Sequence, residues 1–302
     1  MKLFVFGLGY SATSAVNRLG PYCIKEGGWV AATSRSADKV AQLKACGLKG
    51  HVFDGEQAGD DAMQNDLREA THILMSIAPG ERDPALAHHA DDIRANENLQ
   101  WIGYYSTVGV YGDHQGAWVD EAAECRPVSK RSKERVAAEN EWTALGKEID
   151  VPVALIRLAG IYGPGRNGLV NLKSGRARRI IKPGQVFNRI HVDDIAQITE
   201  AAALACQSGV FNGADNEPAP PQDVVEFAAN LMSLPVPPDT PFDEADLSPM
   251  GRSFYGETKR CSNARLKNDL GLKLLYPTYR EALTALWTRG NWDQSPSLNP
   301  LQ

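Results

Sequence analysis

The sequence lacks an apolar run long enough to cross a membrane as a helix, which requires about 20 consecutive apolar residues. It also lacks an excess of basic residues, because its net charge is −5 over 302 residues. Proteins that bind nucleic acid through their general surface charge are usually basic. The opening segment MKLFVFGLG ends in glycines rather than at a small-residue cleavage site, which favours a buried strand over a signal peptide. We therefore expect neither membrane nor nucleic acid as a partner.

Cysteine pairs at disulfide or metal-binding spacing are also missing. The five cysteines are scattered, and none forms a C-x-x-C pair. An odd number of widely spaced cysteines is typical of reduced thiols, so we expect a cytoplasmic protein. The adjacent His88 and His89 would point about 100° apart on a helix, so they do not chelate together easily and we predict no metal site there.

The first half of the sequence alternates between strand-like and helix-like segments. Compact apolar runs, typical of strands buried on both faces of a sheet, occur at 2–6, 29–35, 51–55, 71–79, 101–112 and 151–163. Segments with helical character lie between several of them, at 11–19, 38–45, 90–99 and 133–145. This alternation predicts an α/β fold of the Rossmann type, with a doubly wound parallel sheet.

After about residue 163 the pattern loosens into basic and proline-rich segments. Helices are expected there at 223–232, 263–271 and 279–287. We predict a Rossmann domain at 1–165 that also includes 190–214. The remainder, 166–189 and 215–302, is predicted to form a small C-terminal substrate-binding lobe.

A glycine-rich loop joins the first strand to the first helix. Gly7, Gly9 and Ala12 stand in G-x-G-x-x-A register. In this context the first glycine permits a tight turn, the second lets backbone approach a pyrophosphate, and the small third residue packs helix on strand. The helix N-terminus attracts the anion. The loop predicts dinucleotide binding, and the predicted contacts include the neighbouring Tyr10 and Ser11.

The end of the second strand predicts NADP(H) in preference to NAD(H). An acidic residue there would bind the 2′-hydroxyl of NAD, but residues 33–36 read TSRS. Ser34 and Arg35 suit a 2′-phosphate instead, because a guanidinium and hydroxyls bind phosphate well. Asp54, after the third strand, is a candidate for binding the adenine amino group.

Seven motifs in order carry a family resemblance, and together they cover nearly the whole chain. They are GLGYSA, YYSTVGVYGD, VSKRSKERVAAE, ALIRLAGIYGPGRN, NRIHVDDIAQ, GVFNGADNEP and NARLKNDLGLKLLYPTYREAL. The sequence resembles the extended short-chain dehydrogenase/reductase superfamily, specifically the NAD(P)-dependent epimerase/dehydratase group and its atypical YeeZ-like subgroup. The resemblance implies an NADP-dependent oxidoreductase or epimerase-like enzyme acting on a small molecule.

The resemblance also implies a catalytic Ser/Thr, Tyr and Lys. Thr107, next to Ser106, matches the first, and Lys133 matches the lysine, which would also hold the nicotinamide ribose. Ser129 stands where the tyrosine should be, and an aliphatic hydroxyl is a far weaker acid than a phenol of pKa about 10. Three interpretations stay open: another proton donor, a reaction without strong acid–base catalysis, or NADP(H) binding or sensing without turnover. The alternative donors are Tyr105, Tyr111, Tyr162, His191 or a water held by Ser129.

Further contacts follow from the family pattern and from charge. The cofactor ribose would contact the segment after the fourth strand, at Ser76, Ala78 and Pro79. The nicotinamide face would be lined by Leu158, Ala159 and Gly160. Between residues 163 and 192 the sequence has several arginines and lysines but no aspartate or glutamate. Arg176 and Arg178 are therefore candidates to bind an anionic group of the substrate, although a solvated basic loop is an equal alternative. Monomer and homodimer both remain open.

Overall fold

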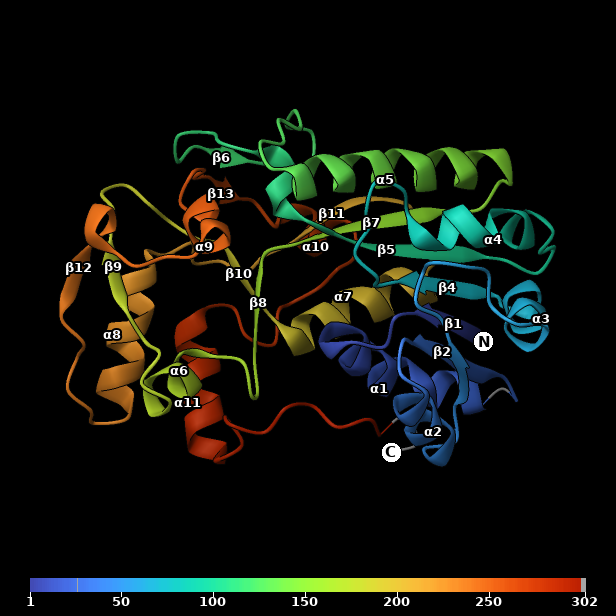
Figure 1. Ribbon diagram of the computed structural model, residues 1–302, viewed down its shortest axis with the longest axis horizontal. Coiled ribbons are helices and arrows are strands. Elements are labelled where there is room, and N and C mark those ends of the chain that lie inside the picture. Colours follow the sequence, from blue (N-terminus) through green and yellow to red (C-terminus); the bar gives the residue numbers. More distant parts are fainter. Residues whose placement is uncertain (26, 300–302) are drawn as a thin grey trace.

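A seven-stranded parallel sheet forms the centre of the protein (Figure 1). The computed structural model describes residues 1–25 and 27–299. The strand order is β11-β7-β5-β4-β1-β2-β3, so the order reverses between β1 and β4, the position where doubly wound sheets form a ligand-binding crevice. The strands are β1 (Lys2–Phe6), β2 (Trp29–Ser34), β3 (Lys49–Val52), β4 (His72–Met75), β5 (Trp101–Thr107), β7 (Val153–Leu158) and β11 (Gly209–Gly213).

Helices cover both faces of this sheet because successive strand side chains point to opposite faces. Leu3 and Val5 of β1 pack in one core cluster, and Phe4 and Phe6 pack in the other. The first cluster includes buried residues of α1 (Tyr10–Lys25), α2 (Ala37–Ala45) and α7 (Val192–Leu204). The second includes buried residues of α3 (Asp61–Glu69), α4 (Pro84–Arg94) and α5 (Lys130–Glu148).

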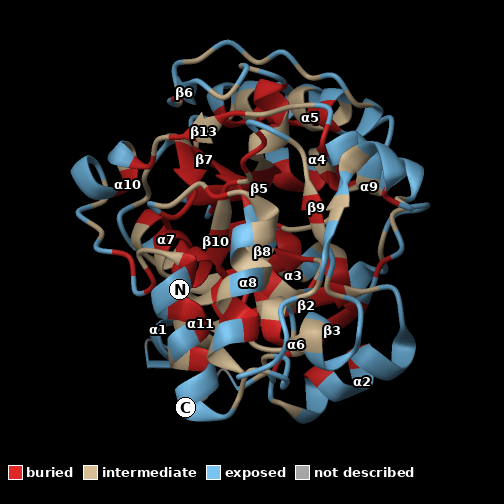
Figure 2. Cartoon of the chain, turned by 90° about the vertical axis from the view of Figure 1, so that its left-hand side faces the viewer, coloured by how far each residue is buried: buried red, intermediate tan, exposed pale blue. Residues whose placement is uncertain are grey.

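A smaller group of elements, here called the lobe, lies beyond one end of the sheet and appears at the left of Figure 1. Its helices α6 (Gly168–Lys173), α8 (Pro221–Leu231) and α11 (Tyr279–Arg289) share a separate apolar cluster. It also contains the strand pair β9 (Arg179–Ile181) and β12 (Asp239–Pro241), η2 (Phe242–Glu244) and α9 (Pro249–Phe254). Figure 2 views the molecule from this side, with buried residues at the centre and exposed residues on the outer helices.

Short elements connect the sheet to the lobe. They are the 3₁₀ turn η1 (Val108–Tyr111), α10 (Ala264–Asn268) and the strand pairs β6 (Trp118–Val119) with β13 (Arg260–Cys261) and β8 (Gly160–Tyr162) with β10 (Arg189–His191). None of the helices within the described residues is long and apolar enough to span a bilayer.

The predicted fold class is confirmed: the chain has a doubly wound parallel sheet. Several elements differ from the sequence prediction. The strand β11 and the helix α3 were not predicted, because β11 is only five residues long with glycine at both ends and α3 is largely polar. The apolar run at 151–163 divides into β7 and β8. The boundary between Rossmann domain and substrate lobe stays a prediction.

Candidate functional site

A cleft of about 1140 Å³ lies over the carboxyl ends of the central strands, between the sheet and the lobe. Its floor is formed by residues 9–11 after β1, Ser76 after β4, residues 105–109 at the end of β5 and 158–162 after β7. Its opposite wall comes from the lobe and from the segment that follows α9. The cleft is larger than the roughly 300–1,000 Å³ of typical small-molecule sites.

The two glycines of the loop after β1 have different surroundings. Gly7 has a φ of +83°, and a Cβ atom there would lie 2.7 Å from Cγ1 of Ile77. Its N–H donates to Oγ1 of Thr33 at 2.8 Å. Gly9 has open space, because a Cβ atom would meet nothing within 4 Å. The fold therefore requires Gly7, whereas Gly9 leaves room for a group in the cleft.

The predicted residues around this loop lie in several places. Tyr10 and Ser11, at the start of α1, line the cleft, while Ala12 is fully buried in the core. Ser76 lines the cleft, as do Leu158, Ala159 and Gly160. Ala78 and Pro79 are outside the described lining.

The end of β2 presents a small polar surface beside the glycine loop. The Thr33 hydroxyl is used by the Gly7 N–H. Arg35 is exposed and has no hydrogen bond to a described residue. Lys39 of α2 donates to the Leu8 carbonyl at 2.6 Å, so a second cation, which the sequence analysis missed, lies beside the loop. Asp54 is exposed. It lies near the end of β2, because the N–H of the preceding Phe53 donates to the Ser34 carbonyl.

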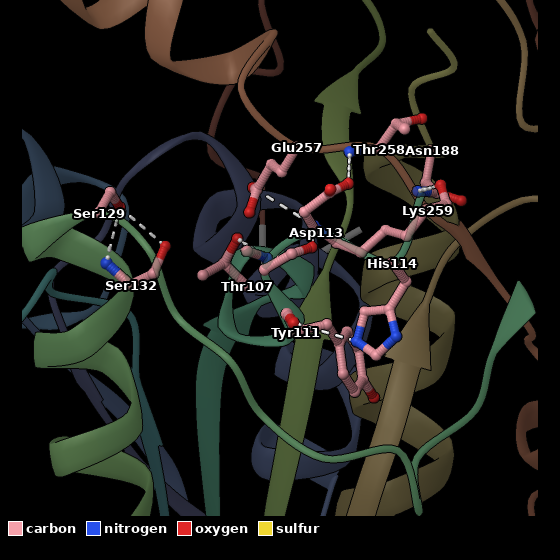
Figure 3. Close-up of polar contacts among 12 residues, drawn as sticks. Thr107, Tyr111, Asp113, His114, Ser129, Ser132, Asn188, Glu257, Thr258 and Lys259 are labelled. Carbon is pink, nitrogen blue, oxygen red and sulfur yellow. Dashed lines mark hydrogen bonds and ion pairs between the residues drawn. The ribbon is translucent and has the colours of Figure 1, made fainter. Parts of the chain in front are cut away.

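The predicted residues on α5 do not enter the cleft. The Ser129 hydroxyl accepts from the Ser132 N–H at 3.1 Å and donates to the Ser132 hydroxyl at 2.9 Å, which makes Ser129 the N-cap of α5 (Figure 3). Lys133 is exposed on the outer side of the helix and is absent from the cleft lining. Arg135, two residues later, lines the cleft. A helix turns about 100° per residue, so Lys133 and Arg135 project in opposite directions.

Thr107 lies at the cleft floor with a second hydroxyl beside it. Its Oγ1 accepts from the Gly109 N–H at 3.1 Å and caps η1. A Cβ atom on Gly109 would lie 3.0 Å from the Ser132 hydroxyl and 3.4 Å from the Thr107 hydroxyl. Thr107 and Ser132 therefore flank the backbone of Gly109, and Ser132 was not predicted from the sequence.

An ion pair between a buried lysine and a partly buried glutamate stands on the opposite wall, in the segment after α9. Nζ of Lys259 lies 3.3 Å from Oε1 of Glu257 and donates to the Gly112 carbonyl at 2.9 Å (Figure 3). Oε2 of Glu257 is buried and has no hydrogen-bond partner among the described residues. Glu257 is the only carboxylate in the described lining of the cleft. Nothing in the sequence pattern singled out either residue.

The alternative proton donors differ in availability. The Tyr105 hydroxyl is bonded to Thr199 at 2.7 Å, and the Tyr111 hydroxyl donates to Asn212 at 2.7 Å. His191 is buried, and burial lowers its pKa to about 3. Tyr162 lines the cleft with a hydroxyl that has no partner among the described residues, and burial raises its pKa well above the usual value. Tyr162 can therefore donate a hydrogen bond but is a poor acid.

Cationic side chains outnumber acidic ones in the described lining of the cleft. The cations are Arg135, Arg166, Arg176, Arg189 and Lys259. Nη1 of Arg189 donates to the carbonyls of Phe187 and Ala219, which holds its guanidinium in the wall. Of the two arginines predicted to bind an anion, Arg176 lines the cleft and Arg178 is exposed outside it.

The two adjacent histidines on α4 have separate partners. His88 bonds to the Gly55 carbonyl, whereas His89 is buried against Asp92 with 2.9 Å between Nδ1 and Oδ2. Over residues 1–25 and 27–299, no three His, Cys, Asp or Glu side chains are grouped to hold a metal ion.

A buried polar pair lies directly beneath the cleft floor. Glu139 of α5 pairs with Arg157 of β7 at 2.7 and 3.1 Å, and it accepts from the Ser106 hydroxyl at 2.5 Å. The Arg157 guanidinium lies 4.8 Å from the centre of the Tyr111 ring. The pair thus ties α5, β5 and β7 together below Thr107.

Comparison with known proteins reveals both sequence and structural relatives. An epimerase family protein SDR39U1 homolog, chloroplastic, from Arabidopsis thaliana is 29% identical over 196 residues, which is 61% of this chain. The chain spans about half, 52%, of that relative. A conserved protein of unknown function from Silicibacter pomeroyi is 45% identical, with a TM-score of 0.84 over 96% of this chain and 99% of that one. No family model matches the sequence.

A more distant structure has the same fold with ligands bound. UDP-glucuronic acid 4-epimerase from Bacillus cereus, in complex with UDP-glucuronic acid and NAD, has a TM-score of 0.73 at 16% identity, over 95% of this chain and 98% of that one. The chain is thus similar in sequence to a protein named as an epimerase family member, and similar in fold to epimerases of known structure. At the position where the resemblance implies a catalytic tyrosine, this chain has Ser129.

Replacing Arg157 with methionine should strongly destabilise the fold. The substitution leaves the Glu139 carboxylate buried without its cation, which costs about 3–5 kcal/mol of unfolding free energy. The double variant Arg157→Met/Glu139→Gln should recover much of this loss, because no buried charge remains. Urea unfolding of the three proteins measures these differences.

The matched control is Lys130→Ala, which removes an exposed partner of Glu134 and should cost at most about 1 kcal/mol. Equal losses for Arg157→Met and Lys130→Ala would show that the buried pair has no special role in stability.

Proposed function

We propose that the protein is an NADP-dependent oxidoreductase or epimerase-like enzyme that acts on a small anionic metabolite. The main support is the continuous cleft that runs from the glycine loop, past Thr107, to a wall rich in cations. One end of such a cleft suits a dinucleotide and the other suits an anionic substrate. The B. cereus relative, which has UDP-glucuronic acid and NAD bound, offers a parallel at the level of the fold.

The glycine loop and the end of β2 would hold the adenosine half of the cofactor. The N–H groups at the N-terminus of α1 would bind a pyrophosphate, and the missing side chain of Gly9 would let it approach them. Arg35 and Lys39 supply two positive charges beside the loop, and Ser34 supplies a hydroxyl. Asp54 stands at the end of β3, within reach of an adenine amino group by analogy with the family. This donor set favours a 2′-phosphate over a 2′-hydroxyl.

The proton step needs a group other than Ser129, whose hydroxyl caps α5. When bound, NADP exchanges a hydride with a carbon of the substrate. For alcohol oxidation, the hydroxyl proton must then pass to a base, and Glu257 is the only carboxylate in the described lining of the cleft. Lys259, 3.3 Å from Oε1, would hold the Glu257 carboxylate in place. Thr107 and Tyr162 would orient the substrate by hydrogen bonds.

A second candidate function is an NADP(H)-binding or sensing protein without turnover. It is favoured by one observation: neither Ser129 nor Lys133 reaches the cleft, so the family's proton-transfer residues are not assembled there. Both functions require cofactor binding, and only turnover distinguishes them.

Replacing Arg35 with aspartate should weaken NADPH binding more than 10-fold, a typical loss for a charged hydrogen-bonding partner, and leave NADH binding unchanged or improved. Energy transfer from tryptophan to the reduced nicotinamide measures both affinities. The control Lys44→Asp makes the same charge change at the far end of α2 and should affect neither. Equal loss of NADPH and NADH binding would rule out the assigned role of Arg35.

Replacing Gly9 with valine should abolish binding of both dinucleotides while the fold survives. The valine side chain meets no protein atom near its Cβ, but it fills space that a pyrophosphate needs. The melting temperature should fall little, since a poorer helix cap costs about 1 kcal/mol. Full NADPH affinity in a folded Gly9→Val protein would contradict the proposed cofactor site.

Replacing Glu257 with glutamine should reduce turnover by about 100-fold or more, the contribution of a general base, without changing NADPH affinity. Absorbance of the reduced nicotinamide can be followed with a panel of phosphate- and carboxylate-bearing alcohols and carbonyl compounds. The control Glu244→Gln alters an exposed carboxylate of η2. If the wild type turns over no compound in the panel but binds NADPH tightly, the sensing function gains support.

A further inference from the structure

Four basic residues lie near the start of α5, and they have different environments. Lys130 is exposed and pairs with Glu81 and Glu134. The Arg131 guanidinium lies 5.4 Å from the centre of the exposed Phe254 ring. Lys133 is exposed, and its side chain has no hydrogen bond or ion pair to any described residue. Arg135 is partly buried and lines the cleft. Only the last of these cations lines the cleft.

Contacts from the floor hold the Arg135 side chain in position. Its Nη1 donates to the Tyr105 carbonyl at the end of β5 and to the Tyr104 hydroxyl, the latter at 3.3 Å. The guanidinium lies 5.7 Å from the centre of the Tyr104 ring. Nε and Nη2 have no partner among the described residues, so these donors remain available. A guanidinium held in this way loses little conformational entropy when it binds a further group.

The sheet order indicates which half of a dinucleotide would meet this cation. In a doubly wound sheet the dinucleotide lies across the point where the strand order reverses, here between β1 and β4. The proposed adenosine contacts, Arg35 and Asp54, follow β2 and β3 on one side. The nicotinamide half would then lie over β5 and β7 on the other side, where Arg135 is anchored.

We propose that Arg135, rather than Lys133, is the cationic residue that contacts the nicotinamide half of the bound dinucleotide. This inference rests on the proposed cofactor site. The free guanidinium donors would bind hydroxyls of the nicotinamide ribose. Because arginine stays protonated at all physiological pH values, Arg135 binds and orients but does not transfer protons, so proton transfer belongs to a different side chain.

The test uses two probes, NADPH and 2′,5′-ADP, which carries the 2′-phosphate but has no nicotinamide. Arg135→Ala should weaken NADPH binding about 10-fold or more, as expected for lost hydrogen bonds to a charged group. It should leave the affinity for 2′,5′-ADP unchanged. Lys133→Ala should change neither affinity, and Lys147→Ala in the last turn of α5 is a neutral control. Isothermal calorimetry gives all the affinities.

Other outcomes would overturn the inference in distinct ways. Loss of NADPH affinity in Lys133→Ala but not in Arg135→Ala would assign the role to Lys133. Equal loss for both probes in Arg135→Ala would mean that Arg135 only supports the cleft. If that variant does not fold, Arg135→Gln keeps a donor for the Tyr105 carbonyl, and unchanged NADPH affinity there would also reject the inference. Wild-type protein that binds neither probe would reject the proposed function itself.

Discussion

The buried pair of Glu139 and Arg157 determines how α5 presents its residues to the cleft. Glu139 lies on α5, Arg157 on β7 and Ser106 on β5, and all three are bonded together. A carboxylate cannot remain buried without such partners, so the helix has one allowed rotation about its axis. From that rotation follows the direction of every other side chain on the helix.

Counting back from Glu139 explains which residues reach the cleft. Arg135 is four residues earlier and Ser132 seven, so they share the inward face. Ser132 is buried beside Gly109, and Arg135 lines the cleft. Lys133 falls between these inward positions and points outward. The spacing between Ser129 and Lys133 is that of a single helix face, but it is not the face that meets the sheet.

The sequence was sufficient to predict the sheet and the glycine loop, because both depend on local patterns of residues. Compact apolar runs predicted six of the seven central strands, and Gly7 has the positive φ that a tight turn uses. The rotation of α5 depends on Arg157, which is 18 residues from Glu139 in the sequence. The Glu257–Lys259 wall depends on a fold-back onto Gly112, 147 residues away from Lys259. No local pattern encodes either contact, so Arg135 and Glu257 were missed while Ser129 and Lys133 were singled out.

In the proposed function, the site would separate two tasks, cofactor binding and proton transfer, that the family resemblance assigns to one tyrosine–lysine pair. A fixed cation, Arg135, lies on the sheet side, and a carboxylate paired with an ammonium, Glu257 with Lys259, lies on the opposite wall. Arginine holds its proton too tightly to exchange it, whereas a carboxylate can accept and return a proton. The opposite wall is connected to the floor through the Gly112 carbonyl at the end of η1, whose first residue follows Thr107. This contact therefore fixes the position of the Glu257–Lys259 pair relative to the floor of the cleft.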